Sequence, residues 1–180
     1  MKSSAKIYFL SAFLIIISSG LLSAQDPAKN DSVRRRYIAA AKEIMTSAHF
    51  CTLITLDEKG RPVGRILEAF APDSNLVVWL GTNPRSRKVQ QIKKNPEVTL
   101  FYFDTNSLTY VSIQGKAQMI TDSLEKTRHW KEEWKPFYRD LKEDYLLIKI
   151  TPQFLELLSP KNGFSGDPVT WKTPSVKFDQ

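Results

Sequence analysis

The stretch 80–88 gathers cations and hydroxyls where a predicted strand ends and a helix begins. The first backbone N–H groups of a helix have no partner within it, and the helix dipole adds partial positive charge there. Such a helix start binds anions, and guanidinium groups grip phosphate oxygens in pairs while lysine supplies a point charge. The pattern predicts a phosphate site, with a solvated basic helix face as the alternative. Its polar residues are Thr82, Ser86, Arg85, Arg87 and Lys88, with Lys93 nearby.

No standard nucleotide loop is present in this stretch. Gly81 would let a ligand approach the backbone, but it lacks the glycine spacing and the Gly-Lys-Ser/Thr ending of a P-loop. A Rossmann fingerprint is also missing from the sequence. A nucleotide phosphate would therefore have to be bound by another architecture.

Metal and thiol chemistry find little support in the sequence. The single Cys51 cannot form an intramolecular disulfide, and its apolar strand context favours a buried inert thiol. The two histidines, His49 and His129, lie far apart without metal-ligand spacing around them. We therefore expect no metal site, and structural or exposed roles for both histidines.

The elements that must position these residues follow from the spacing of apolar residues. Helical spacing begins at Ser32, a candidate N-cap, and a short helix starts at Asn83-Pro84 and ends near Lys94. Asp122, with Glu125 three residues later, predicts a further helix through about 138. Strands are expected over 50–56, 61–70, 76–80, 98–103, 109–120 and 145–158. Six strands joined by hairpins predict a mainly β fold, a small closed barrel with flanking helices.

The N-terminus has the layout of a secretory signal peptide. Lys2 and Lys6 precede the apolar run 7–22, and small residues follow it. We expect a signal peptide over 1–24, a flexible lead-in over 25–31, and an exported, periplasmic protein; an uncleaved anchor is the alternative. Leu22 fits the −3 position poorly, so the cleavage position stays open.

The charge balance suits an anionic ligand. The chain carries 26 basic and 19 acidic residues, a net charge of +7, or +5 without the two lysines of the signal peptide. This is not the dense single-face basicity of a nucleic-acid binder, so we expect no nucleic-acid partner.

Three segments in order resemble the pyridoxamine 5'-phosphate oxidase-like family of FMN-binding split barrels, and the resemblance covers roughly 45–158. They are Gly60-Arg61-Pro62-Val63-Gly64-Arg65-Ile66, then Thr82 to Lys88 with Gln91-Ile92 and 95–100, and finally Val111-Ser112-Ile113-Gln114-Gly115-Lys116-Ala117. The resemblance implies a six-stranded split barrel over 32–158 and a tail over 159–180 that packs on the barrel or on a dimer partner.

The resemblance also implies cofactor contacts, position by position. Arg65, Thr82, Arg87 and Lys88 match residues at the FMN phosphate, and Ser86 joins them from the anion-site pattern. Ile66 and Leu67 match positions whose backbone follows the isoalloxazine ring, and Gly81 matches one that touches the flavin. Tyr110 matches a side chain at the flavin edge, with an ordinary barrel aromatic as the alternative.

The family implies a homodimer with FMN at the subunit interface. The tail contains several aromatic residues, which suggests that it docks rather than hangs free. Trp171 is a candidate contact from the second subunit, although packing within its own chain is the favoured interpretation.

Two departures argue against a true pyridoxamine-phosphate oxidase. Phe70 stands where those enzymes carry a lysine, and the tail lacks their Trp-Pro-x-Arg-type segment. The closer resemblance is to the general-stress-protein branch, whose substrates are often undefined. The leading hypothesis is an FMN-dependent oxidoreductase without an identified catalytic residue. The alternatives are a non-catalytic flavin-binding stress module, or a binder of haem or a deazaflavin, although His49 and His129 are poor candidates for haem ligands.

Overall fold

The computed structural model describes the backbone of residues 27–178 and the side chains of residues 31–178, so the predicted signal peptide lies outside the described residues. Its helices are α1 (Pro27–Ala48), α2 (Arg87–Lys94) and α3 (Ser123–Arg128), with 3-10 turns η1 (Glu132–Trp134) and η2 (Pro160–Asn162). Its strands are β1 (Phe50–Leu56), β2 (Pro62–Glu68), β3 (Val78–Thr82), β4 (Glu97–Asp104), β5 (Thr109–Ile120), β6 (Leu146–Leu158) and β7 (Ser175–Lys177). Over the described range no helix is long and apolar enough to cross a membrane.

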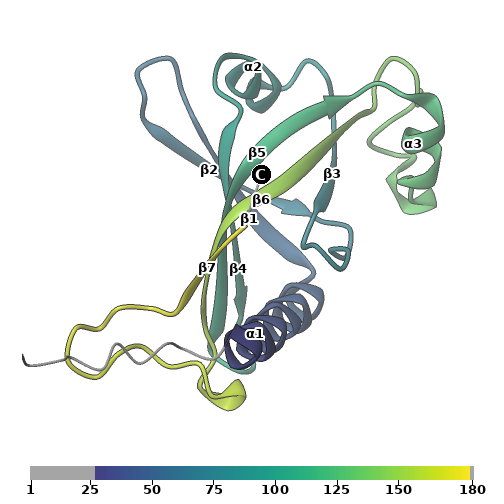
Figure 1. The fold of residues 1–180 in the computed structure, drawn as a ribbon. Coiled ribbons are helices and arrows are strands. Elements are labelled where there is room, and N and C mark those ends of the chain that lie inside the picture. The colour runs from purple at the N-terminus through teal and green to yellow at the C-terminus, as the bar shows by residue number, and fades with distance from the viewer. Residues whose placement is uncertain (1–26, 179–180) are drawn as a thin grey trace, which may run out of the picture.

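These strands form one antiparallel sheet in the spatial order β2-β1-β4-β5-β6-β3, with β7 paired to β6 (Figure 1). Its longest pairing is β5–β6, whose register shifts between Gln114 and Gly115. A Cβ at Gly115 would lie 2.5 Å from the Thr151 carbonyl oxygen, so only glycine fits this crossing. Bulges of this kind increase the local twist and bend a strand.

The mainly β fold with flanking helices is confirmed, but the prediction of a closed, six-stranded barrel is wrong. The tail adds a seventh strand, β7, and the sheet remains open. Its end strands, β2 and β3, meet only at the Ala69–Leu80 bridge and at the adjacent hydrogen bond from Phe70 N–H to the Trp79 carbonyl, 3.0 Å. Beyond that point the two strands separate, and α2 lies at the same end of the sheet (Figure 1).

Strand alternation gives the sheet a buried inner face. Leu53, Leu100 and Ile113 lie in register across β1, β4 and β5, and all three are fully buried. Helix α1 packs against β4 and β5 and buries Ala41 and Ile44. The core therefore lies between α1 and the concave inner face.

Helix α1 starts earlier than the sequence pattern indicated. It begins at Pro27, a favoured residue for the first helical position, so Ser32 lies inside the helix and is not its N-cap. Residues 27–31, expected as a flexible lead-in, are its first turns.

The two shorter helices also differ from prediction. The N-cap of α2 is Ser86, because Asn83 instead forms a turn in which its side-chain oxygen accepts the Arg85 N–H at 2.9 Å. Asp122 caps α3 as its pattern predicts, accepting the Glu125 N–H at 2.9 Å. The expected helix to 138 stops at Arg128, and the segment that follows it supplies aromatic side chains to a second buried cluster.

The tail docks in part on its own chain. Phe164, Val176 and Phe178 pack against the core, and β7 pairs with the end of β6. Trp171 does not: its side chain is 84% exposed, at a backbone φ of 57°. The interpretation that Trp171 packs within its own chain is therefore wrong, because the loop between η2 and β7 projects away from the sheet (Figure 1).

Cys51 is a buried free thiol on the inner face, as expected. Burial raises its pKa to about 12, which keeps it protonated at neutral pH. It is therefore part of the core.

Tyr37 joins α1, β6 and the tail through one buried hydroxyl. This hydroxyl accepts the Leu157 N–H at 2.7 Å and donates to the Pro174 carbonyl. We expect Tyr37→Phe to lower the free energy of unfolding by about 1–3 kcal/mol, because the buried Leu157 N–H loses its side-chain acceptor. Urea denaturation measures this change.

The control is Tyr138→Phe. Tyr138 is partly buried, and its hydroxyl has no hydrogen bond to any residue that the structure describes. Equal unfolding free energies for the Tyr37 and Tyr138 variants would contradict the structural role of Tyr37.

Candidate phosphate-binding site

Arg65 is held in place entirely by neutral groups. It lies partly buried on β2, where its guanidinium donates to the Leu53 carbonyl at 3.3 Å, to Thr55 Oγ1 at 2.6 Å and to Gln91 Oε1 at 2.9 Å. Thr55 Oγ1 also donates to Gln91 Oε1 at 2.7 Å, which completes a triangle between β1, β2 and α2. The orientation of the guanidinium is thus fixed while its charge is left without a counterion.

A second set of polar groups lies at the end of β3. Lys88 Nζ donates to Thr82 Oγ1 at 2.8 Å, and Thr82 Oγ1 lies 3.3 Å from Ser86 Oγ. Ser86 is the N-cap residue, but its side chain makes no capping hydrogen bond. Its hydroxyl is therefore free to face Thr82 and a ligand.

The cations of these two sets are close enough to affect one another. Burial and the neighbouring Arg87 lower the pKa of Arg65, and burial and Arg65 lower the pKa of Lys88. Within residues 27–178, none of Arg65, Arg87 and Lys88 forms an ion pair with a carboxylate. Like charges gathered in this way favour an anion between them.

The other cations of the predicted stretch have different surroundings. Arg85 pairs with Asp144 at 2.6 Å, and Lys94 pairs with Glu58 at 2.5 Å. Lys93 is exposed on α2 and has no hydrogen bond or ion pair with a described residue. The structure thus separates three converging cations from a basic stretch that looked uniform in sequence.

The missing side chain of Gly81 makes room for neighbouring aromatic rings of the same chain, not for a ligand. A Cβ there would lie 2.4 Å from Trp134 Cζ3 and 2.7 Å from Tyr145 Cε2. These rings cover the strand just before Thr82. They therefore fix the position of the β3 end.

Two of the residues matched to flavin contacts lie on the other face of the sheet. The register Arg65–Leu53–Leu100–Ile113 places Arg65 on the inner face. Because side chains alternate along a strand, Ile66 and Tyr110 belong to the outer face, and Leu67 returns to the inner one. Ile66 is 73% exposed, whereas Leu67 packs against the core.

Tyr110 makes specific contacts on that outer face. Its ring stacks on Phe101 with centroids 5.5 Å apart, and its hydroxyl lies 3.2 Å from Thr173 Oγ1. Within one chain, the structure therefore brings together Arg65, Thr82, Ser86, Arg87 and Lys88, and leaves Ile66 and Tyr110 on the opposite face.

Sequence reasoning missed the groups that hold Arg65. Gln91 and Thr55 were given no role, yet they supply two of its three acceptors. Gln91 lies one helical turn after Arg87, so helix geometry places the two on neighbouring parts of the same face. That spacing was the available signal.

A network around Glu68 was also not anticipated. Its carboxylate accepts from Lys131 Nζ at 2.5 Å and Trp134 Nε1 at 2.7 Å, and it lies 2.9 Å from His49 Nε2. Desolvation tends to raise the pKa of Glu68, but the hydrogen bonds from Lys131 and Trp134 outweigh it and leave the pKa lowered. The network ties the end of β2 to the segment that covers Gly81.

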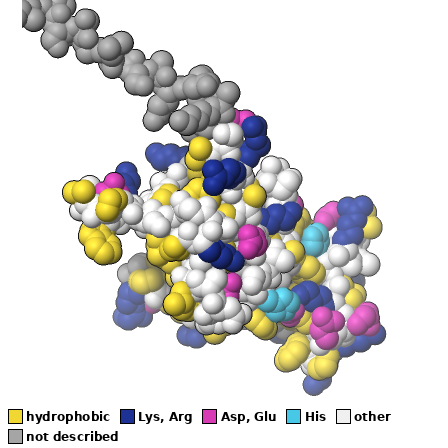
Figure 2. All heavy atoms as spheres, turned by 90° about the horizontal axis from the view of Figure 1, so that it is seen from below, with side chains coloured by type: hydrophobic (Ala, Val, Ile, Leu, Met, Phe, Trp, Pro, Cys, Tyr) yellow, Lys and Arg dark blue, Asp and Glu magenta, His cyan; other side chains and the backbone are white. Residues whose placement is uncertain are grey.

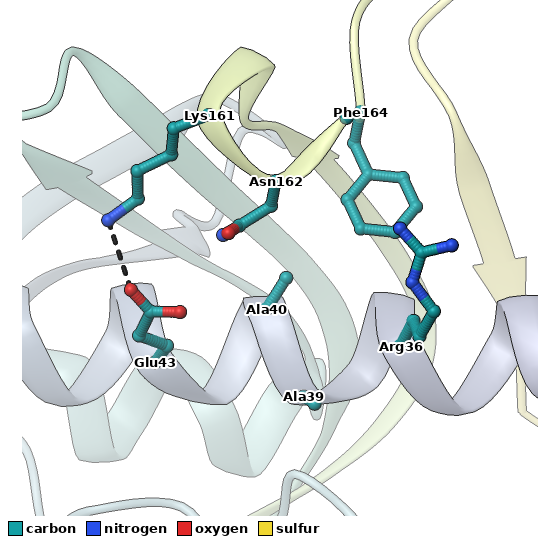
Figure 3. Close-up of a pocket in the computed structure, with 8 residues that line it drawn as sticks. Arg36, Ala39, Ala40, Glu43, Lys161, Asn162 and Phe164 are labelled. Atoms are coloured by element: carbon teal, nitrogen blue, oxygen red, sulfur yellow. Dashed lines mark hydrogen bonds and ion pairs between the residues drawn. The ribbon is translucent and has the colours of Figure 1, made fainter.

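A hollow of about 590 Å³ between α1 and η2 lies far from these groups (Figures 1 and 3). Its Lys161 is paired with Glu43 at 3.0 Å, and Arg36 lies over the Phe164 ring. None of the predicted site residues lines it. Lys161 is neutralised by Glu43 and Arg36 is an exposed single cation, so the hollow has no group of unpaired cations like that of Arg65, Arg87 and Lys88.

The coupling between Arg65 and Lys88 gives a direct test of the site. Replacing Arg65 by Met removes a neighbouring positive charge, so the pKa of Lys88 should rise towards its ordinary value. Inorganic phosphate should raise the same pKa in the unmodified protein, because an anion favours the charged ammonium. NMR titration of ¹³Cε-labelled lysine measures both changes.

The control is Arg85→Met, which removes a cation already paired with Asp144. It should leave the pKa of Lys88 unchanged. If Arg65→Met also leaves that pKa unchanged, the two cations do not share one site.

Comparison with known proteins places this geometry in a family. The family model described as pyridoxamine 5'-phosphate oxidase matches residues 38–158. Among curated proteins no match was found.

Solved structures share the fold at low sequence identity. A Clostridium acetobutylicum protein related to general stress protein 26 of the pyridoxinephosphate oxidase family has a TM-score of 0.67 and 20% identity, covering 81% of this chain and 96% of that one. A pyridoxamine 5'-phosphate oxidase-related, FMN-binding protein from Nostoc punctiforme has a TM-score of 0.54 and 14% identity, covering 86% and 98%. A haem-binding protein from Mycobacterium smegmatis has a TM-score of 0.60 and 15% identity, covering 78% and 57%. The predicted resemblance is confirmed: the chain belongs to the pyridoxamine 5'-phosphate oxidase family.

Proposed function

We propose that this chain binds FMN and acts as a flavin-dependent oxidoreductase of still undefined substrate. The observation that carries the proposal is the group of three cations, Arg65, Arg87 and Lys88, gathered without a carboxylate beside the hydroxyls of Thr82 and Ser86. FMN as the ligand is supported by membership of the family and by the FMN-binding neighbour of the same fold.

A phosphate monoester fits this cluster chemically. It carries close to two negative charges and three acceptor oxygens, which match fixed cations and hydroxyl donors. Arg65 would contact it from β2, Arg87 and Lys88 from α2, and Thr82 and Ser86 from the loop between β3 and α2. Burial first, and the neighbouring cation second, lower the pKa values of Arg65 and Lys88, and an anion at this place offsets both effects.

The cofactor and the protein would have different roles in the reaction. When bound, FMN supplies the redox chemistry through its ring, and the protein supplies binding, orientation and electrostatics. The phosphate cluster anchors the cofactor and takes no part in hydride transfer. No residue of the cluster is assigned a catalytic role.

Haem is the alternative ligand, and the two histidines would be its candidate axial ligands within the described residues. His49 Nε2 lies 2.9 Å from the Glu68 carboxylate. His129 Nδ1 lies 3.0 Å from the Glu125 carbonyl, and its ring stacks on Trp79 with centroids 4.2 Å apart. An iron at His49 Nε2 would have to displace the Glu68 carboxylate, whereas His129 Nε2 has no hydrogen bond to a described residue and is the candidate ligand if haem binds. A phosphate-bearing deazaflavin would use the same cations, and absorption spectroscopy distinguishes it from FMN.

A homodimer forms part of the proposal because the outer sheet face is apolar and exposed. Phe50, Ile66, Phe101 and Phe103 are 52%, 73%, 36% and 48% exposed, and register places them on the same face as Tyr110. Exposed apolar patches of this kind mark interaction surfaces. A second copy of the chain would cover the patch.

No nucleic-acid partner and an exported, periplasmic location are also proposed. On the face that contains α1, basic side chains are interspersed with acidic ones rather than gathered in one stripe (Figure 2). Export rests on the basic start and apolar run of residues 1–24.

The phosphate assignment predicts a difference between FMN and riboflavin, which lacks the phosphate. Arg65→Ala combined with Lys88→Ala should weaken FMN binding by on the order of 100-fold or more, since each charge-assisted hydrogen bond contributes about 1.5–3 kcal/mol. Riboflavin affinity should change little. Flavin fluorescence titration measures both affinities.

The matched control is Lys93→Ala, which removes an exposed cation from the same helix and should leave FMN affinity unchanged. Full FMN affinity in the double variant would refute the phosphate site, and a Soret band in the purified protein would favour haem instead. Bleaching of bound flavin by NADH or NADPH supports an enzyme, whereas a stable oxidised flavin with every donor supports the passive binder.

The outer-face assignment predicts the effect of a charge in the patch. Phe101→Glu should weaken self-association at least about tenfold, because a carboxylate would be buried against apolar side chains. FMN affinity should fall with it if the second copy completes the cofactor site. Sedimentation velocity and FMN titration measure the two effects.

Leu124→Glu is the control, because Leu124 is 57% exposed but lies on α3. It should leave the dimer intact. A monomeric wild-type protein that binds FMN fully would contradict the dimer proposal while leaving the phosphate site standing.

A further inference from the structure

A separate cavity of about 500 Å³ lies against α3 and the start of β6. Its volume falls within the range of small-molecule sites. Its walls include the apolar side chains of Pro84, Leu141, Tyr145 and Leu146. Exposed hydroxyl residues, among them Thr127, complete the lining.

The unusual member of this lining is Lys126. It is only 9% exposed, and its Nζ donates to the Lys142 carbonyl at 3.2 Å and lies 5.9 Å from the centroid of the Tyr145 ring. An ammonium group has three donors, and only this one hydrogen bond is made to a described residue. Lys126 has no carboxylate partner within the described part of the chain.

Burial without a counterion is costly for an ammonium group. Taking a charge out of water costs several kcal/mol unless an opposite charge and hydrogen bonds compensate. Lys131 shows the usual solution in this same region, since it is partly buried and pairs with Glu68 at 2.5 Å. Lys126 lacks such a partner, which leaves its charge available to a ligand.

The other charges around the cavity do not supply a counterion. Lys142 and Glu143 also line the cavity, but both are exposed and neither forms an ion pair with Lys126. Asp144 is engaged by Arg85 at 2.6 Å. Among the residues that line the cavity, Lys126 is therefore the one buried charge.

We propose that this cavity binds a small apolar monocarboxylate, with its carboxylate on Lys126 Nζ and its aromatic or branched body against Tyr145, Leu141 and Leu146. One buried cation matches one carboxylate, and the apolar walls match a hydrophobic body. The site is distinct from the phosphate cluster: Leu146 pairs with Thr82 across the β3–β6 register, so the two sites are neighbours that use different cations.

The test uses 4-phenylbutanoate and its neutral isostere 4-phenylbutanamide, titrated calorimetrically into the full-length protein. The unmodified protein should bind the carboxylate at least about tenfold more tightly than the amide. Lys126→Met keeps the apolar stem but removes the charge, and should abolish this preference. Lys142→Met removes an exposed charge from the same cavity and should preserve it.

Leu141→Trp fills the cavity and should block both ligands, which keeps the test informative if Lys126→Met folds poorly. FMN affinity should stay unchanged in all three variants, so failure here is distinguishable from failure of the FMN proposal. No binding of 4-phenylbutanoate at millimolar concentration, or an undiminished preference in Lys126→Met, overturns the inference.

Discussion

Repulsion among Arg65, Arg87 and Lys88 is the constraint on which the structure of this end of the sheet depends. The surrounding residues must hold these cations close together against that repulsion. Cations gathered without a carboxylate destabilise the folded state. Burial, and after it the charge of a neighbouring cation, lower the pKa values of Arg65 and Lys88. Hydrogen bonds to neutral acceptors hold two of the three: Arg65 donates to the Leu53 carbonyl, Thr55 and Gln91, and Lys88 donates to Thr82. A site fixed in this way is already organised before an anion arrives, which lowers the cost of binding.

The β3 end needs its own support because β3 is an edge strand. It pairs with β6 but touches β2 only at the Ala69–Leu80 bridge. The rings of Trp134 and Tyr145 close over Gly81, and the Glu68 carboxylate bonds Trp134 from the other side of the gap. Thr82 is therefore positioned by the packing of Trp134 and Tyr145 on Gly81 as well as by the pairing of β3 with β6. The segment after α3 is not part of that helix, and its aromatic side chain Trp134 packs over Gly81 together with Tyr145.

The sequence predicted features that depend on local patterns, and it missed those that depend on distant partners. Strand alternation and the Asp122 capping pattern are local, and both hold in the structure. The failure of the barrel to close is not local, because it depends on how β2 and β3 separate around α2. Similarly, helical spacing predicts that Gln91 lies near Arg87, one turn before it. The contact between Gln91 and Arg65 depends on the fold, because the two residues are on different elements.

The alternation along β2 limits how one ligand can meet the residues that the family resemblance selected. Arg65 and Ile66 are neighbours, so their side chains lie on opposite faces, and only something at the edge of β2 can reach both. One edge of β2 pairs with β1. Within the described residues, the other edge is unpaired except near the Ala69–Leu80 bridge at its end. Under the proposed function, the phosphate would lie on the inner-face cations while the rest of the cofactor passes the open edge. Tyr110 lies three strands from β2 on the outer face, so a second copy is the simpler source of such a contact.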